Sequence, residues 1–423
     1  MYNKPTDSYY LHYFSRKQPD LNWENPEIRQ EIFDMMRFWF DKGIDGFRMD
    51  SISLIAKDPS FPLIDSKKYP DIFSFYAKEP RLHLYLHEMN RQVLSKYDCM
   101  SVGEGSAVMV DDVAKFVDPA RPELNMLYHF DAARIRNTTL PDNPESGIDY
   151  SLIALKKMFT EWDKAIDKGW PSIYLGNHDQ PRMVSRFGSD KDEFRALSAK
   201  MLITFLLTMR GTPYWFAGDE IGMRNIRFDR IEDYNDIDTI NRYKKAKAEG
   251  KDPQAVLDEQ KETGRDNART PFQWDRSPEA GFTAGTPWLK VNPDYTWINV
   301  ADEEKDPTSI LNYFKKVVSF RKENPSLIYG SYHLLDAENP QCYIFLRKTG
   351  ADTYLIMLNF SPKAAISTPG IDMSNAHVLL DNYGDRSHMA PQKDITLRPF
   401  EAIVFQLNHP VYESFIDSLD LLE

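Results

Sequence analysis

The stretch Gly-Ile-Asp-Gly-Phe-Arg-Met-Asp at residues 43–50 is typical of a short buried β-strand that ends in a carboxylate. Before it, Asn25-Pro26 indicates a helix start and Gly43 a helix end. The apolar residues that repeat at helical spacing between these two points are Ile28, Ile32, Met35 and Trp39. A helix followed directly by a buried strand predicts a β/α architecture with parallel strands.

The same order of strand, acid and helix recurs twice. Residues 99–104 read Cys-Met-Ser-Val-Gly-Glu, and residues 172–179 read Ser-Ile-Tyr-Leu-Gly-Asn-His-Asp. A lone acid after a strand is often a helix cap or a solvated loop residue. Three in succession favour a shared role, because the carboxyl ends of the strands in a β/α barrel converge on one pocket. We therefore expect Asp50, Glu104 and Asp179 to act together.

Cleavage of a glycosidic bond needs such a set: a nucleophile, a proton donor and a charge near the oxocarbenium-like transition state. Two further segments carry recognisable motifs, Gln-Pro-Asp-Leu-Asn at residues 18–22 and Gly-Arg-Asp-Asn-Ala-Arg-Thr-Pro at residues 264–271. Together with the three acidic motifs they resemble the α-amylase superfamily of retaining glycoside hydrolases. Within it, the chain is most similar to the α-glucosidase and oligo-1,6-glucosidase group, from about Tyr9 to Leu407.

The resemblance implies that Asp50 is the nucleophile, Glu104 the proton donor and Asp179 the transition-state stabiliser. It implies an exo-acting retaining α-glucosidase that releases terminal α-linked glucose from short oligosaccharides by double displacement. The resemblance also implies that the residue after the nucleophile selects which glycosidic linkage is cleaved. In this family a valine there accompanies a preference for α-1,6 linkages. Ser51 departs from valine. Its smaller side chain favours α-1,4 or dual specificity.

Three further residues are implied to line the glucose subsite: Arg48, His178 and Arg269. Arg48 precedes Asp50 by two residues, so both side chains point the same way on an extended segment and the guanidinium can keep the carboxylate ionised. Glu104, in contrast, needs a raised pKa, which burial near another carboxylate supplies. From residue type alone, a structural histidine and a surface ion pair are the better interpretations of His178 and Arg269.

The predicted fold class is α/β, a (β/α)8 TIM barrel followed by an all-β C-terminal sandwich. We expect residues 1–24 to end an inserted subdomain, 25–328 to form the catalytic barrel portion and 329–423 to form the sandwich. Only five barrel strands are expected, beginning near residues 44, 99, 124, 172 and 214. The last of them is predicted at Tyr214–Ala217, after an apolar helix over 193–210.

This count predicts an N-terminally incomplete barrel, roughly strands 4–8, because three further strand and helix units would come before Asp50. The family motif Asp-x-Val-x-Asn-His is absent from the sequence. We therefore interpret the chain as a C-terminal piece of a longer enzyme. Unpaired strand edges would leave such a piece inactive alone and prone to aggregate.

The net charge of −12 argues against nucleic acid and anionic membranes as partners, since both require basic patches. No apolar run approaches a membrane span. The expected partner is a small oligosaccharide, the expected location the cytoplasm and the expected state a monomer without cofactors. Cys99 and Cys342 are expected to be buried thiols, although a disulfide stays open.

The acidic stretch at residues 229–238 invites a calcium interpretation but fails the loop test. Counting from Asp233, position six is Asp238 instead of glycine, and position twelve is Lys244 instead of glutamate. We expect a solvated loop and no metal. The resemblance adds that residues 231–234 lie in an insertion near the active-site mouth. The charged segment 244–261 is expected to be a solvated helical face.

Other functions remain open. Within the enzyme class, the alternatives are a trehalose-6-phosphate hydrolase, for which no basic phosphate pocket can be identified, and a sucrose or trehalose isomerase. From another class, the chain could be an inactive fragment or a non-catalytic amylase-like partner protein. Such partners carry a membrane helix and lack catalytic acids, whereas this sequence keeps all three.

Overall fold

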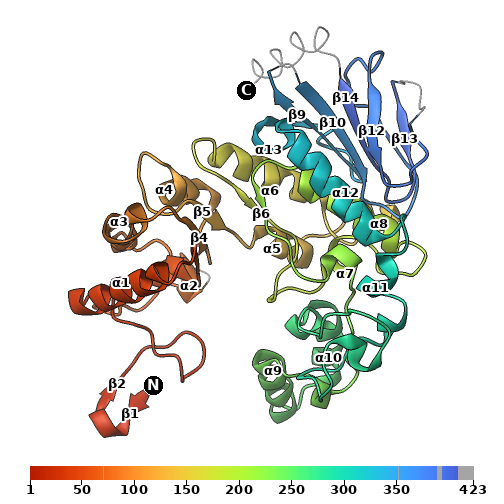
Figure 1. The fold of residues 1–423 in the computed structure, drawn as a ribbon. Helices are drawn as coiled ribbons and strands as arrows, with labels where there is room; N and C mark the ends of the chain where they lie inside the picture. Colours follow the sequence, from red (N-terminus) through yellow and green to blue (C-terminus); the bar gives the residue numbers. More distant parts are fainter. Residues whose placement is uncertain (70, 351, 388–392, 408–423) are drawn as a thin grey trace. The chain divides into compact units, whose positions relative to one another are not determined.

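The computed structural model describes residues 1–69, 71–350, 352–387 and 393–407 (Figure 1). The chain forms two compact units. Unit 1 contains residues 1–131 and 161–172, and unit 2 contains residues 132–160 and 173–423. The division falls inside the expected barrel portion, not at residue 328, so the domain boundaries expected from the sequence stay a prediction. The two units are described separately below.

Unit 1 contains the three parallel strands that follow the first sequence motifs. The sheet order is β3 (Gly46–Met49), β4 (Met100–Glu104) and β5 (Met126–Tyr128). The unit also contains a small hairpin and several α-helices: β1 (Tyr2–Asn3), β2 (Ser8–Tyr9), α1 (Pro26–Asp41), α2 (Ile72–Tyr76), α3 (Arg81–Gln92) and α4 (Val113–Val117). The strands predicted at these three places are confirmed.

Helix α1 begins as predicted, at Pro26. The Asn25 side chain accepts a hydrogen bond from the backbone N–H of Glu27, and Pro26 occupies the first turn. The buried residues of the helix are Phe33, Met36 and Phe40. Of the apolar residues that repeat at helical spacing, Ile28 and Ile32 are half-buried and Met35 and Trp39 are exposed. Phe40 stacks on Tyr97 with ring centroids 4.4 Å apart.

Unit 2 contains most of the helices. In chain order they are α5 (Asp131–Thr138), α6 (Leu152–Ala165), α7 (Met183–Phe187), α8 (Arg195–Thr208), α9 (Ile237–Ala248), α10 (Pro253–Thr263), α11 (Val300–Glu303), α12 (Ile310–Glu323) and α13 (Ser326–Tyr329). The unit boundary cuts α6, so its last residues belong to unit 1, as does the first residue of α5. Nearly every residue of α8 is buried, and this helix packs against α12.

Strands β6 (Ser172–Ile173) and β7 (Thr212–Pro213) pair with each other. The strand was predicted at Tyr214–Ala217, so its observed position is displaced towards the N-terminus. The backbone N–H of Tyr214 donates to the carbonyl of Ile173. A proline in β7 removes one N–H donor, so only a short pairing forms.

The C-terminal part of unit 2 is all β, as predicted. Its larger sheet is antiparallel in the order β12 (His377–Asp381), β14 (Ala402–Leu407), β10 (Asp352–Asn359), β9 (Cys342–Thr349) and β8 (Ser331–Leu335). A second sheet pairs β11 (Ala365–Ser367) with β13 (Ile395–Leu397). Apolar side chains of both sheets form one core. The opposite face of the larger sheet meets α8, where Phe205 lies 5.1 Å from Tyr343 between ring centroids (Figure 1).

Two buried arginines bind the end of α8, one from α12 and one from this sheet. Arg321 of α12 donates to the carbonyls of Leu207 and Met209, each at 2.8 Å. Arg347 of β9 donates to the carbonyl of Thr208 at 2.6 Å. The last carbonyls of a helix lack partners within the helix, so these guanidinium groups satisfy them and favour the negative end of the helix dipole.

Both cysteines are free thiols, as expected. Cys342 is buried as predicted, whereas the predicted burial of Cys99 is wrong, because this side chain is only half-buried. Burial raises the pKa of Cys342 to about 12. Within the described ranges, no helix combines the length and apolar character needed to cross a membrane. Among the same residues, no group of His, Cys, Asp and Glu side chains is arranged to hold a metal ion.

Candidate active site

In unit 1, two of the expected catalytic acids lie side by side. Strands β3 and β4 are parallel, and Met49 pairs with Gly103. The next residue on each strand, Asp50 and Glu104, therefore lies at the same carboxyl edge of the sheet. The pair differs in exposure, because the Asp50 side chain is 75% exposed and that of Glu104 only 10%.

The Arg48 guanidinium joins these two acids. It pairs with Asp50 through Nη1 and with Glu104 Oε2 through Nη2, the latter at 2.7 Å. The same Nη2 donates to the hydroxyl of Tyr128, whose ring lies 5.3 Å from the guanidinium carbon. The alternation of side chains along β3 predicted the pairing with Asp50. The contacts with Glu104 and Tyr128 depend on strand register, which the sequence does not reveal.

The surroundings of Glu104 favour its protonated form. Burial raises the pKa of this carboxyl, and a hydrogen bond with Asp50 raises it further. The backbone N–H of Ser51, at 3.2 Å from Oε2, and the Arg48 guanidinium act in the opposite direction without cancelling the rise. Glu104 thus has the environment expected of a proton donor.

In unit 2, Asp179 contacts Arg265 and Arg269 of one motif and His178 of another. Its Oδ1 lies 2.8 Å from Arg269 Nη2 and 3.5 Å from Arg265 Nη1, and its Oδ2 lies 3.2 Å from His178 Nε2. Arg269 also donates through Nε to the carbonyl of His178 at 2.8 Å. Residue type alone suggested an ion pair for Arg269, and the structure contains one, with Asp179, the expected transition-state stabiliser, as its partner. The side chain of Asp179 is 30% exposed and so can be reached by solvent.

A buried acid supports the segment that leads to Asp179. Asp219 lies close to the Cα of Gly176. A Cβ added to Gly176 would lie 2.5 Å from Asp219 Oδ2. Burial raises the pKa of Asp219 to about 7, against the lowering effect of Arg182, whose Nη1 lies 3.9 Å from Oδ1. A glycine is needed at position 176 because any side chain would press on this carboxyl group.

Three residues of the site were not predicted from the sequence: Tyr128, Arg265 and Asp236. Arg265 belongs to the motif at residues 264–271, which was quoted without assigning it a role. Tyr128 ends the strand next to Glu104. Asp236 belongs to the acidic stretch expected to be a solvated loop, and for this residue the expectation is wrong.

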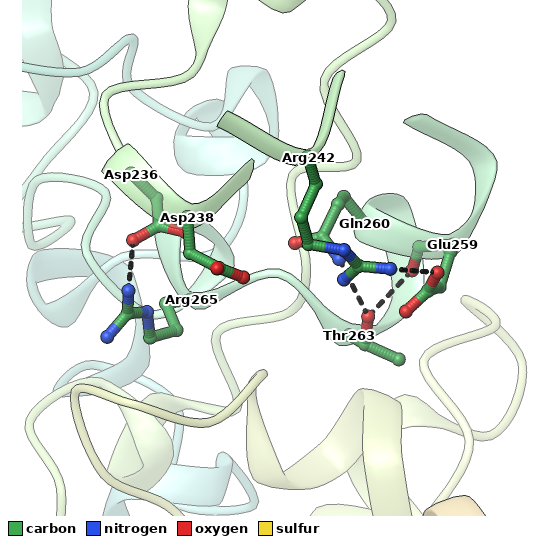
Figure 2. A pocket seen from close by; sticks show the side chains of 7 residues that line it. All are labelled: Asp236, Asp238, Arg242, Glu259, Gln260, Thr263 and Arg265. Atoms are coloured by element: carbon green, nitrogen blue, oxygen red, sulfur yellow. Dashed lines mark hydrogen bonds and ion pairs between the residues drawn. The ribbon is translucent and has the colours of Figure 1, made fainter. Parts of the chain in front are cut away.

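Only 3% of the Asp236 side chain is exposed, and its Oδ1 lies 2.6 Å from Arg265 Nη2. The pair borders a pocket of about 630 Å³ that lies between α9 and α10 (Figure 2). Arg242 and Glu259, 2.5 Å apart, pair elsewhere on its wall. The helices themselves are largely exposed, as expected for residues 244–261.

The family that matches the sequence is the α-amylase catalytic domain, over residues 1–330. The chain belongs to the α-amylase family. An oligo-1,6-glucosidase of Parageobacillus thermoglucosidasius is 47% identical over 419 residues, which cover 97% of this chain and 73% of that protein. An oligo-1,6-glucosidase of Bacillus cereus is 44% identical, with 96% of this chain and 73% of that protein covered.

Solved members of the α-amylase family share the fold. The isomaltulose synthase of Protaminobacter rubrum superposes with a TM-score of 0.89 at 37% identity, covering 96% of this chain and 73% of that structure. These matches confirm the fold class, an α/β barrel with a C-terminal β domain, and membership of the glucosidase group. The chain is accordingly a glycoside hydrolase of the α-amylase family.

Proposed function

We propose that the protein is an exo-acting retaining α-glucosidase that hydrolyses terminal α-linked glucose from short oligosaccharides. The observation that carries this proposal is the pair at the edge of β3 and β4. An exposed Asp50 lies beside a buried Glu104 whose pKa is raised, and one guanidinium contacts both. Double displacement requires one ionised carboxylate as nucleophile and one protonated carboxyl group as acid.

In the first step, ionised Asp50 attacks the anomeric carbon while Glu104 donates its proton to the departing oxygen. The glucosyl ester that forms no longer carries the charge of Asp50. The charge of Asp50 and the hydrogen bond that Asp50 accepts from protonated Glu104 both raise the pKa of Glu104, so esterification of Asp50 lowers this pKa. Glu104 then accepts a proton from water, which hydrolyses the ester. The same two groups thus explain why one residue serves as acid and then as base.

Asp179, His178 and Arg269 are proposed to bind hydroxyl groups of the same glucose unit. The carboxylate of Asp179 accepts from hydroxyl groups, and Arg269 and His178 supply donors. Strengthening of these bonds as the ring flattens lowers the barrier more than it tightens substrate binding. We further propose a cytoplasmic monomer in carbohydrate metabolism that acts without cofactor or metal.

The linkage preference is proposed to be α-1,4 or dual, and Ser51 is the residue to test. Ser51 has φ 44° and ψ 32°, in the left-handed region, and its backbone N–H contacts Glu104. A valine there is strained, because β-branched residues rarely adopt positive φ. Turnover of maltose and isomaltose should be compared among wild type, Ser51→Val and Ser51→Gly. This comparison separates the effect of side-chain size on linkage preference from the effect of backbone strain. An unchanged maltose to isomaltose ratio in Ser51→Val would remove the selector role.

The stereochemistry of hydrolysis tests the proposal directly. Proton NMR of maltose cleavage at early times should show α-glucose as the first new sugar, because two displacements retain the anomeric configuration. Asp50→Ala should abolish the reaction. Release of β-glucose, or unchanged turnover by Asp50→Ala, would contradict the mechanism.

An isomerase is the second candidate, favoured by the similarity to the isomaltulose synthase. The two reactions share the glucosyl ester and differ in what attacks it. Incubation with sucrose distinguishes them, since a hydrolase releases glucose and fructose and an isomerase forms a new disaccharide. A trehalose-6-phosphate hydrolase would cleave that phosphorylated sugar in preference to maltose.

A further inference from the structure

Asp236 faces both arginines that surround Asp179. Its Oδ1 lies 2.6 Å from Arg265 Nη2 and 3.8 Å from Arg269 Nη1. Arg265 in turn contacts Asp179 through its other terminal nitrogen. The two guanidinium groups therefore lie between two carboxylates, one half-exposed and one buried, and the four charges balance.

The Asp236 carboxylate is itself fixed. Its Oδ2 accepts from the backbone N–H of Thr239 at 3.0 Å and from the Thr239 hydroxyl at 2.9 Å, which caps the first turn of α9. The backbone N–H of Asp236 donates to Asp266 Oδ2 at 2.8 Å. Burial opposes ionisation, but the bonds from Thr239 and the charge of Arg265 outweigh it and hold the pKa of Asp236 below its usual value.

Among the described residues, the ion-pair partners of Arg265 are Asp179 and Asp236. Its side chain is 36% exposed and lines the pocket of about 630 Å³ beside α9 and α10 (Figure 2). This space would accommodate other rotamers of a long side chain. The ion pair with Asp236, visible in Figure 2, holds one terminal nitrogen of Arg265 while the other contacts Asp179.

We propose that Asp236 is a positioning residue, which holds Arg265 and Arg269 so that Asp179 keeps acceptor capacity for sugar hydroxyl groups. Without the buried carboxylate, two guanidinium groups would share Asp179 alone. Both would draw on its oxygens, and the electron density available to a hydroxyl donor would fall. The loss would be greatest where those hydrogen bonds are strongest, in the transition state. This inference rests on the proposed glucosidase function.

The test is Asp236→Asn, because asparagine keeps an oxygen for the Thr239 cap and removes only the charge. We expect kcat on maltose to fall about 10-fold with KM changed less than about 2-fold, since the interaction acts in the transition state. Asp238→Asn is the matched control. It removes the same charge from the same turn at an exposed position whose carboxylate makes no ion pair with Arg265 among the described residues. Equal losses in the two variants would overturn the proposal.

A second measurement does not depend on turnover. Arg269 Nε–H donates to the carbonyl of His178, so its proton should exchange slowly in NMR spectra, with assignment from Arg269→Lys. We expect the Arg269 Nε proton to exchange faster than in wild type in Asp236→Asn and in Arg265→Gln. In Asp238→Asn its exchange rate should equal that of wild type. Arg265→Gln leaves the α9 cap intact, which keeps the test valid if Asp236→Asn folds poorly. Unchanged exchange in both variants would overturn the positioning role, whereas a wild type inert towards α-glucosides would refute the proposed function instead.

Discussion

Replacing Arg48 by methionine should move the alkaline limb of the pH profile to higher pH. Arg48 is the one cation in contact with Glu104 among the described residues, at 2.7 Å between Nη2 and Oε2, and it lowers the pKa of that carboxyl group. Removing the charge leaves burial and the bond with Asp50, both of which raise the pKa. The proton donor then keeps its proton to higher pH.

The size of the shift follows from Coulomb's law. Unit charges about 4 Å apart interact by about 1 kcal/mol in water and about 4 kcal/mol near a protein surface. The Arg48 side chain is 35% exposed, so solvent screening favours the lower part of this range. An interaction of about 1.4 kcal/mol corresponds to about one pKa unit. We therefore expect the limb to move up by about one pH unit.

The assay is kcat/KM on isomaltose between pH 5 and 9, since that parameter reports the ionisation of the free enzyme. Arg48→Lys is the control. Lysine keeps a positive charge but lacks the fork that contacts both acids, so its activity should fall with a smaller shift of the limb. An aryl α-glucoside with a good leaving group needs less protonation and should show a weaker alkaline limb in every variant. A limb that stays in place, or moves to lower pH, in Arg48→Met would refute the reasoning.

Three further substitutions test other parts of the structure. Asp179→Asn should lower kcat by about 100-fold or more while the Kd for glucose, from calorimetry, changes little, because the charge acts mainly in the transition state; a proportional loss of binding would contradict this. In Asp219→Asn, the free energy of unfolding in urea should depend less on pH. Burial raises the folded pKa of Asp219 to about 7, above the unfolded value of 3.8. The free energy of unfolding of wild type therefore falls by up to about 4 kcal/mol as the pH rises between these two values. The same pH dependence in wild type and Asp219→Asn would contradict this prediction. Arg347→Met should cost about 3–5 kcal/mol, since it leaves buried carbonyls unpaired; Lys348→Met, at the half-buried neighbouring position, should cost much less.

Much of the fold follows from local pattern. The strands before Asp50 and Glu104 and the apolar helix expected over residues 193–210, observed as α8, were predicted close to their observed bounds, because a local apolar pattern specifies them. The strand predicted after residue 213 was not found there. A short run of aromatic residues fits a strand and a packed loop equally well, and tertiary pairing decides between them.

The face of a helix is harder to predict when the sequence offers two. In helix α1 the apolar repeat included Met35 and Trp39, which are exposed in the structure, and left out Phe33 and Phe40, which are buried. What selects Phe33 and Phe40 is the shape of their partners, including Tyr97, which lies far along the chain. Periodicity shows that a helix exists, but partners remote in sequence determine which side is buried.

The same reasoning explains why the acids of the site were easier to find than the residues that tune them. Asp50 and Glu104 are recognisable because each ends a strand in a motif. Tyr128 and Asp236 act through register and through a buried ion pair, and neither leaves a local pattern. A carboxylate in an acidic stretch is normally solvated, so burying Asp236 is favourable only because a helix cap and Arg265 compensate for lost hydration. Charged residues that contradict their local sequence context in this way are the ones whose substitution is most informative about the site.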